Sequence, residues 1–184
     1  MRHSTNLLDE HRRNAVAKLH MSYYYAIVKI AKENGGQIRS FNGDSLLVFF
    51  IGKNNETVQR AVKSAFRMKY AISEIVNPVL KNYIDIDFGI GMDVGSIVAT
   101  KVGVGGDETT KDLIWLGDAV NRATKISDEC SSPENVGISE SVFGCLSNDC
   151  LMTSNNDCVW SGGYMKYNMN EMAYYKSTCY IEIQ

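Results

Sequence analysis

The segment Gly35–Phe50, GGQIRSFNGDSLLVFF, constrains the fold more than any other part of this 184-residue chain. Two short strand-like runs, Gln37–Phe41 and Ser45–Ile51, flank Asn42-Gly43, a dipeptide that strongly favours a tight β-hairpin. Asp44 follows at the tip of that hairpin, where a carboxylate is held rigidly enough to serve as a metal ligand. Aspartate is also an ordinary turn residue, so the segment alone leaves both interpretations open.

Helical and strand-like patterns alternate along the rest of the chain. Apolar spacing predicts a first helix from Thr5 or Asn6 to Gly35-Gly36, with the tyrosines at 23–25 in core and interface packing. A second helix is predicted to begin at Asn54-Asn55 and to stop before Pro78, because the residue preceding a proline is pushed out of the α region.

The second half of the chain is predicted to form mainly strands. Alternating apolar residues in Tyr83–Gly95 predict a half-buried strand, and its glycines predict close approach of other backbone. Further strands are predicted at 96–102, 112–116 and 136–139, a helix at 119–129, and β-hairpins after residue 151. This order predicts an α+β class, ferredoxin-like in its core, with helices flanking a central antiparallel sheet.

Composition and charge place the chain among ordinary globular proteins of one domain, residues 1–184. Hydrophobic residues make up 45%, and the net charge of −2 gives no reason to expect nucleic acid or a membrane surface as partner. The sequence contains neither a run of transmembrane length nor the apolar core of a signal peptide, and its five cysteines show no CxxC spacing. We therefore expect a cytoplasmic protein with reduced thiols.

Three blocks stand in one order along Met1–Phe143. The first, GGQIRSFNGDSLLVFF, is similar to the pattern GG-x-x-x-K-x-x-GD-x-x-x-x-x-F. The second, IDFGIGMDVGSIVATKVG, is similar to paired strands written RIGIHTG-x-x-x-x-G-x-x-G, and the third, LIWLGDAVNRATKI, is similar to GDAVN-x-A-x-R-L. Together they resemble the catalytic domain of class III nucleotidyl cyclases, the adenylate and guanylate cyclase family.

This resemblance implies a reaction, a cofactor and a dimer. In the family, the ribose 3′-hydroxyl of a nucleoside triphosphate attacks its own α-phosphate and pyrophosphate leaves. Two divalent cations, Mn²⁺ or Mg²⁺, hold the attacking oxygen and the phosphates. The site lies between two protomers, so the resemblance implies a homodimer with a nucleoside triphosphate as its substrate.

The resemblance also implies where the metals bind. Asp44 matches the family's second metal-binding carboxylate. The first is an Asp at the end of the family's first strand, followed by a loop that MRHST resembles, so both that Asp and that strand would precede Met1. Met1 would then offer its backbone carbonyl to a metal, and Thr5 would lie near the triphosphate, whereas a frayed terminus is the alternative for Met1–Thr5. We expect that the chain begins part-way through the domain and, as it stands, binds metal poorly and is inactive.

Two residues of the third block match catalytic positions. Asn121 matches the family asparagine that positions the ribose. Lys125 stands where the family has an arginine that faces the transition-state phosphate, and lysine keeps the charge but loses the planar, bidentate fork. Apart from the resemblance, an exposed helix face explains both residues equally well.

Ser40 and Ile114 occupy the positions that read the base. Adenylate cyclases carry Lys and Asp there, and guanylate cyclases tend to carry Glu and Cys, so neither purine pair is present. This favours a pyrimidine cyclase that acts on UTP or CTP, similar to the bacterial anti-phage enzymes, with a separate effector that responds to the cyclic nucleotide. Two alternatives stay open: an adenylate or guanylate cyclase that deviates here, and a non-catalytic nucleotide-binding regulatory relative.

Overall fold

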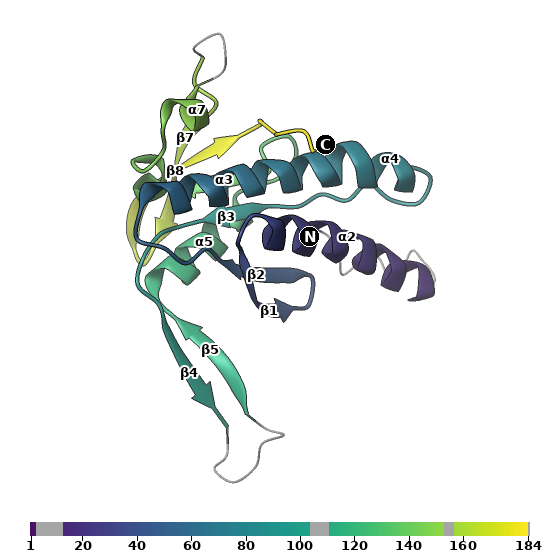
Figure 1. Ribbon diagram of the computed structural model, residues 1–184, viewed down its shortest axis with the longest axis horizontal. Helices are drawn as coiled ribbons and strands as arrows, with labels where there is room; N and C mark the ends of the chain where they lie inside the picture. Colours follow the sequence, from purple (N-terminus) through teal and green to yellow (C-terminus); the bar gives the residue numbers. More distant parts are fainter. Residues whose placement is uncertain (3–12, 104–110, 153–156, 184) are drawn as a thin grey trace.

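Two long helices, α2 (Arg13–Glu33) and α3 (Asn55–Tyr70), lie side by side in the computed structural model (Figure 1). The structure describes residues 1–2, 13–103, 111–152 and 157–183, so the predicted start of the first helix lies outside it. The predicted end is confirmed, because Gly35 has a φ of +80° and the next N–H, that of Gly36, donates to the Ala31 carbonyl at 2.7 Å. None of the helices in these ranges has the length and apolarity needed to cross a bilayer.

The second helix begins as predicted but does not stop before Pro78. Asn54 caps it by accepting a hydrogen bond from the Thr57 N–H at 3.2 Å. After α3 the chain forms a π-helix, Ala71–Val76, and then a short helix, α4 (Asn77–Leu80), with Pro78 in its first turn. The predicted stop is therefore wrong, because a first-turn residue needs no intrahelical N–H partner and the fixed φ of proline suits that position.

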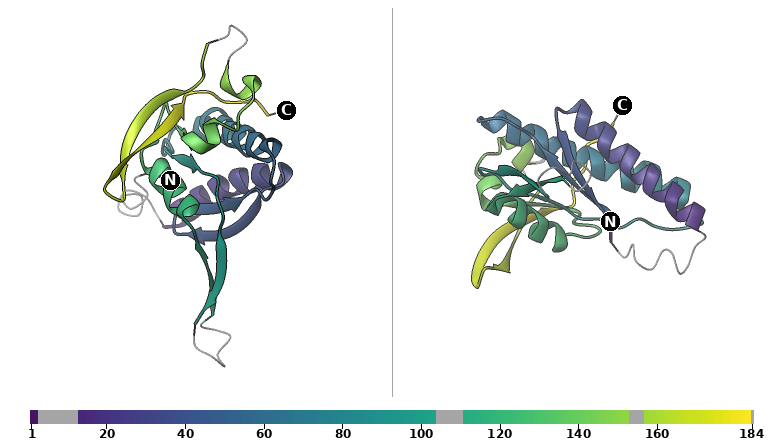
Figure 2. Two further views of the ribbon diagram at one scale, coloured as in Figure 1. Left: turned by 90° about the vertical axis from the view of Figure 1, so that its left-hand side faces the viewer. Right: turned by 90° about the horizontal axis from the view of Figure 1, so that it is seen from below.

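A four-stranded sheet, in the order β3-β6-β8-β7, lies between α3 and a further helix, α5 (Asp118–Asp128). Its strands are β3 (Ile90–Met92), β6 (Val136–Ser139), β7 (Ser161–Tyr167) and β8 (Asn170–Ser177). Val136 and Ile138 pack with side chains of α3, whereas Gly137 between them faces α5. Figure 2 shows the sheet and its flanking helices from two further sides.

The prediction of a central antiparallel sheet holds only in part. The β6–β8 and β7–β8 pairs are antiparallel, but β3 runs parallel to β6. A parallel pair needs a long crossover connection, and the segment that carries α5 supplies it. Ile86 and Phe88 are buried as expected, and the Arg2 N–H donates to the Asp87 carbonyl between them at 2.8 Å. Within the described ranges, however, the regular hydrogen-bond ladder of this sheet begins only at β3.

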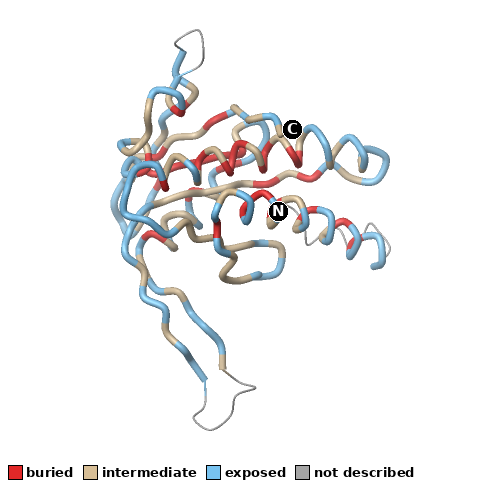
Figure 3. Tube along the Cα trace, viewed as in Figure 1, coloured by how far each residue is buried: buried red, intermediate tan, exposed pale blue. Residues whose placement is uncertain are grey.

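Two hairpins lie outside this sheet. Strands β1 (Gln37–Asn42) and β2 (Ser45–Phe49) meet at a two-residue turn, Gly43-Asp44, one residue further along than predicted, with Asp44 at the tip as expected. Strands β4 (Val98–Val102) and β5 (Asp112–Leu116) form the second hairpin. It projects from the body as an arm (Figures 1 and 2), and Figure 3 shows it mostly exposed.

Helix α5 rests directly on β3 and on the residue before it, because glycines there leave no side chain in the way. A Cβ atom at Gly91 would lie 1.9 Å from the Ala123 carbonyl oxygen, and one at Gly89 would lie 2.1 Å from the Ser127 carbonyl oxygen. These distances are shorter than any van der Waals contact. The close backbone approach predicted at these glycines is therefore confirmed.

We expect Gly91→Ala to lower the free energy of unfolding by about 3 kcal/mol, because the added methyl group must push α5 away from β3. Chemical denaturation measures this change. Gly144→Ala is the matched control, since Gly144 has a φ of −65° and its nearest atom to a new Cβ lies at 3.6 Å. If both variants unfold at the wild-type denaturant concentration, the contact of α5 with β3 is not as close as described.

Candidate functional site

Asp44 lies at the hairpin tip beside the first residue of the chain. The Met1 amino group donates to the Asp44 backbone carbonyl at 3.2 Å and lies 3.9 Å from Oδ2 of its carboxylate. The Met1 side chain is buried against the core between α2 and α3, whereas the Asp44 side chain is 32% exposed. The structure thus brings together two of the residues predicted for the metal site. Thr5, which was predicted to lie near the triphosphate, is outside the described residues.

The donors around Asp44 fit one side of a divalent-cation site. Within the described ranges, no group of three or more His, Cys, Asp and Glu side chains is gathered as a ready-made cage. Magnesium in nucleotide enzymes is usually held by one or two carboxylates together with substrate phosphates, so such a cage is not required. Asp44 provides a hard, partly exposed carboxylate on a tight turn, which suits this mode of binding.

Two tyrosines of α2 lie beneath the hairpin tip. The Tyr24 hydroxyl donates to the Gly43 carbonyl at 2.6 Å and lies 3.3 Å from the Ser45 carbonyl oxygen. Burial, with a contribution from the Asp44 charge, raises the pKa of both Tyr23 and Tyr24, so both hydroxyls keep their protons at neutral pH. The sequence predicted only packing for these tyrosines and missed this contact.

Ser40 lies on β1 and Ile114 on β5, and the residues next to them in sequence are in contact. The Arg39 guanidinium of β1 lies 5.1 Å from the ring centroid of Trp115 on β5, and the rings of Phe49 and Trp115 meet edge to face at 5.0 Å. Successive side chains of a strand point to opposite faces, so Ile114 points away from this junction and is 37% exposed. Ser40 is half-buried.

Asn121 and Lys125 lie one turn apart on an exposed face of α5. Among the residues that the structure describes, no hydrogen bond or ion pair joins either of them to Asp44. The predicted site residues of one chain therefore lie on two elements, the β1–β2 hairpin and α5, that no such bond joins directly.

A buried carboxylate, which the sequence analysis did not single out, fixes α5 to the sheet. The Asp93 side chain is fully buried just after β3, forms an ion pair with Arg122 of α5 and accepts a hydrogen bond from the Ser139 hydroxyl of β6 at 2.6 Å. Arg122 directly follows Asn121, so this network also sets the position of the predicted ribose-binding residue. Both ionic partners belong to the quoted blocks, but nothing in their spacing shows that they meet.

The other end of α5 is held by Arg2. Its guanidinium donates to the carbonyl oxygens of Ser127 at 2.8 Å and of Cys130 at 2.6 Å. A cation at the C-terminus of a helix satisfies carbonyls that have no intrahelical partner and complements the helix dipole. The first two residues of the chain therefore contact both the hairpin tip and α5.

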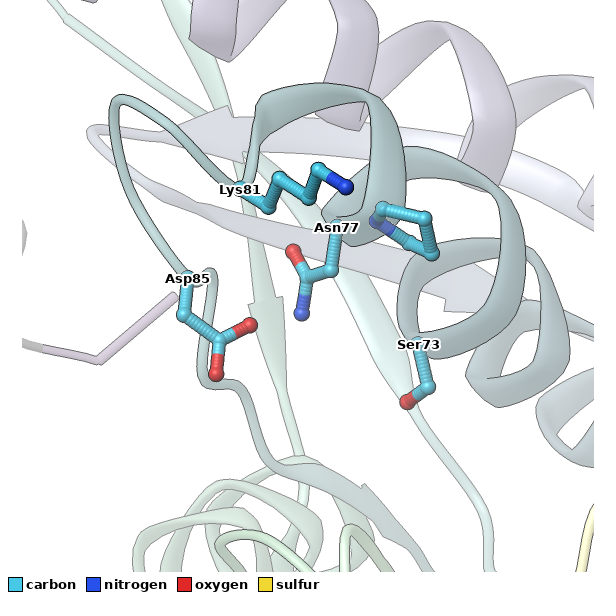
Figure 4. A pocket seen from close by; sticks show the side chains of 5 residues that line it. Ser73, Asn77, Lys81 and Asp85 are labelled. Atoms are coloured by element: carbon cyan, nitrogen blue, oxygen red, sulfur yellow. The ribbon is translucent and has the colours of Figure 1, made fainter.

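A shallow concavity next to α4 is not part of this site. It is lined by Ser73, Asn77, Pro78, Lys81 and Asp85 (Figure 4). The Asn77 side-chain amide donates to the Ile86 carbonyl at 3.1 Å and accepts a hydrogen bond from the Ile86 N–H at 3.0 Å. This joint holds α4 against the segment that leads to β3, and none of the predicted site residues lines it.

Comparison with known families gives the same assignment as the three sequence blocks. Residues 1–175 match the family model described as the adenylate and guanylate cyclase catalytic domain. The chain belongs to this family. It is a class III nucleotidyl cyclase domain, and such domains are lyases that dimerise and typically use two divalent metal ions.

Among curated proteins, the chain is similar to several named uridylate cyclase. It is 30% identical to that of Xanthomonas perforans over 162 residues, which cover 85% of this chain and 67% of the relative. It is 25% identical to that of Burkholderia cepacia, with 86% and 67% covered, and 28% identical to that of a Rhodovulum strain, with 70% and 55% covered. The chain thus spans about two thirds or less of the length of these curated relatives.

Solved structures of the family share the fold. The guanylyl cyclase Cya2 superimposes with a TM-score of 0.80 at 19% identity, over 99% of this chain and 89% of that one. The adenylyl cyclase CyaB from P. aeruginosa gives 0.73 at 20% identity, over 100% and 90%. At such identities the likeness concerns the fold alone.

We expect Arg122→Ala to lower the free energy of unfolding by about 3 kcal/mol, because it leaves the buried Asp93 carboxylate without its cation. Thermal and chemical denaturation measure the loss. Lys63→Ala is the control, since it removes an exposed pair with Asp149 and should cost less than about 1 kcal/mol. Equal losses in the two variants would contradict a structural role for the Asp93 pair.

Proposed function

We propose that the protein is a pyrimidine nucleotidyl cyclase that converts UTP or CTP to the 3′,5′-cyclic nucleotide and pyrophosphate. The choice of base rests on Ser40 and Ile114, which occupy the two positions that would read the base. They match neither the Lys and Asp of adenylate cyclases nor the Glu and Cys of guanylate cyclases. The relatives named uridylate cyclase support the same choice.

Asp44 and the Met1 backbone carbonyl are the groups that would hold the divalent cations. When bound, Mn²⁺ or Mg²⁺ supplies positive charge around the attacking oxygen and the departing pyrophosphate. Asn121 orients the ribose so that its 3′-hydroxyl faces the α-phosphate. The Lys125 ammonium would face the phosphate oxygens, and Thr5 would lie near the triphosphate.

A second copy of the chain completes the site. The large apolar side chains exposed on the described strands of the β4–β5 arm are Val98, Val102, Leu113, Ile114 and Leu116. Cross-strand pairing of Val98 with Leu116 and of Thr100 with Ile114 places several of them on one face. An exposed apolar strip of this kind indicates a protein partner. In a homodimer, α5 of one protomer would face the β1–β2 hairpin of the other, which carries Asp44.

The product would act as a signal in bacterial anti-phage defence. A cyclic nucleotide diffuses away from the enzyme, so a separate effector that responds to it would carry out the defence. A non-catalytic, nucleotide-binding role is the second candidate, and the observation that favours it is Lys125 in place of the family's arginine.

We expect the protein, expressed from its complete reading frame and supplied with Mn²⁺, to form cyclic UMP or cyclic CMP. Each of the four ribonucleoside triphosphates is incubated separately, and the products are separated by chromatography and identified by mass. Product from ATP or GTP alone would defeat the pyrimidine assignment. Binding of a triphosphate without any product would establish the non-catalytic role instead.

We expect Asp44→Ala and Asn121→Ala to be inactive alone and partly active when mixed. Each mixed dimer contains one site with an intact Asp44 from one protomer and an intact Asn121 from the other. Turnover is measured after the two variants have been unfolded and refolded together. A mixture as inactive as its components would contradict a site shared between protomers, and full activity of Asp44→Ala alone would refute the metal role.

A further inference from the structure

A two-residue hairpin turn such as Gly43-Asp44 can adopt either of two backbone arrangements, type I′ or type II′. Gly43 has a φ of +59°, and Asp44 is not among the described residues with positive φ. This is the pattern of a type II′ turn, in which only the first central residue has positive φ. Rotation of the central peptide by half a turn gives type I′, in which both central residues have positive φ, and aspartate tolerates that conformation better than most residues.

The central peptide of that turn is the one that Tyr24 holds. Its carbonyl is the Gly43 carbonyl, which accepts the Tyr24 hydroxyl at 2.6 Å, and the Ser45 carbonyl on the other side of Asp44 lies 3.3 Å from the same oxygen. If the central peptide rotated, the Gly43 carbonyl would point away from α2 and this hydrogen bond would be lost. The orientation of that peptide also sets the φ of Asp44 and hence the direction of its side chain.

The position of the Tyr24 ring is set by contacts other than this hydrogen bond. It meets the ring of Tyr23 edge to face at 5.5 Å and that of Phe41, near the end of β1, at 5.2 Å. Both contacts depend on the ring and neither on the hydroxyl. The hydroxyl keeps its proton at neutral pH, as described above, and is therefore a permanent donor.

We propose that the Tyr24 hydroxyl is a positioning group for the metal site: by holding the Gly43 carbonyl, it selects the turn conformation in which the Asp44 carboxylate is directed to bind a divalent cation. This inference rests on the proposed role of Asp44 as a metal ligand. Tyr24 itself touches neither metal nor nucleotide. Partners that orient a metal ligand commonly contribute about 10- to 100-fold in metal affinity or activity.

The test compares wild type, Tyr24→Phe and the control Tyr25→Phe, each expressed from the complete reading frame. Tyr24→Phe removes the donor and keeps the ring contacts with Tyr23 and Phe41. Tyr25→Phe makes the same chemical change one residue further along α2, on a side chain that is 70% exposed. Mn²⁺ binding is followed by the electron paramagnetic resonance of free Mn²⁺, turnover is followed as a function of Mn²⁺ concentration, and hydrogen exchange reports on the amides of residues 42–45.

We expect Tyr24→Phe to raise the half-saturating Mn²⁺ concentration about 10-fold in both binding and turnover, with the KM for nucleotide at saturating Mn²⁺ unchanged. The amides of residues 42–45 should exchange faster, whereas the thermal midpoint should stay close to that of wild type. Tyr25→Phe should match wild type in every readout. A purely structural role would lower the thermal midpoint without a change specific to Mn²⁺.

Each other outcome overturns the inference or separates it from the proposed function. An unchanged Mn²⁺ requirement in Tyr24→Phe overturns it, and so does an equal change in Tyr25→Phe. Wild type that does not bind Mn²⁺ overturns it together with the metal role of Asp44. Wild type that binds Mn²⁺ but makes no cyclic nucleotide refutes the proposed function alone, and the binding and exchange data then still decide the role of Tyr24.

Discussion

The contact of α5 with glycine backbone is the constraint on which the candidate site depends. Gly89 and Gly91 let the helix approach so closely that a single added methyl group would overlap its main chain. Two ionic contacts then fix it, one between Arg122 and the buried Asp93 and one between Arg2 and the carbonyls at the end of the helix. A helix held in this way presents Asn121 and Lys125 at a defined height above the sheet, although both side chains are exposed.

The sequence predicted those parts of the fold whose signals are local. The Asn54 cap, the Gly35 helix end and the β1–β2 hairpin each depend on a few neighbouring residues, and each is found at or within one residue of its expected place. The passage of the helix through Pro78 and the parallel pairing of β3 with β6 depend on contacts between distant segments. Neither propensity nor periodicity contains that information, so both were missed.

The same distinction holds for the candidate site. The resemblance supplied Asp44 and Asn121 from motifs, but the residues that orient them, Tyr24 and Asp93, act across the fold. The Tyr24 hydroxyl meets a carbonyl 19 residues further along the chain, and the Asp93 carboxylate meets Arg122, 29 residues away. No local pattern in the sequence marks contacts at such separations, so neither residue could be predicted from it.

The placement of Asp44 and of Asn121 on two different elements of one chain gives the exposed residues a common explanation. An exposed asparagine and lysine, a partly exposed aspartate and an apolar strip on a projecting arm would each be ordinary on a monomer. Association of two copies through the arm would bury the strip containing Val98 and Leu116 and would bring the two groups of site residues together in the same step. Metal binding and dimerisation would then be coupled, because the cations and the triphosphate would contact both chains.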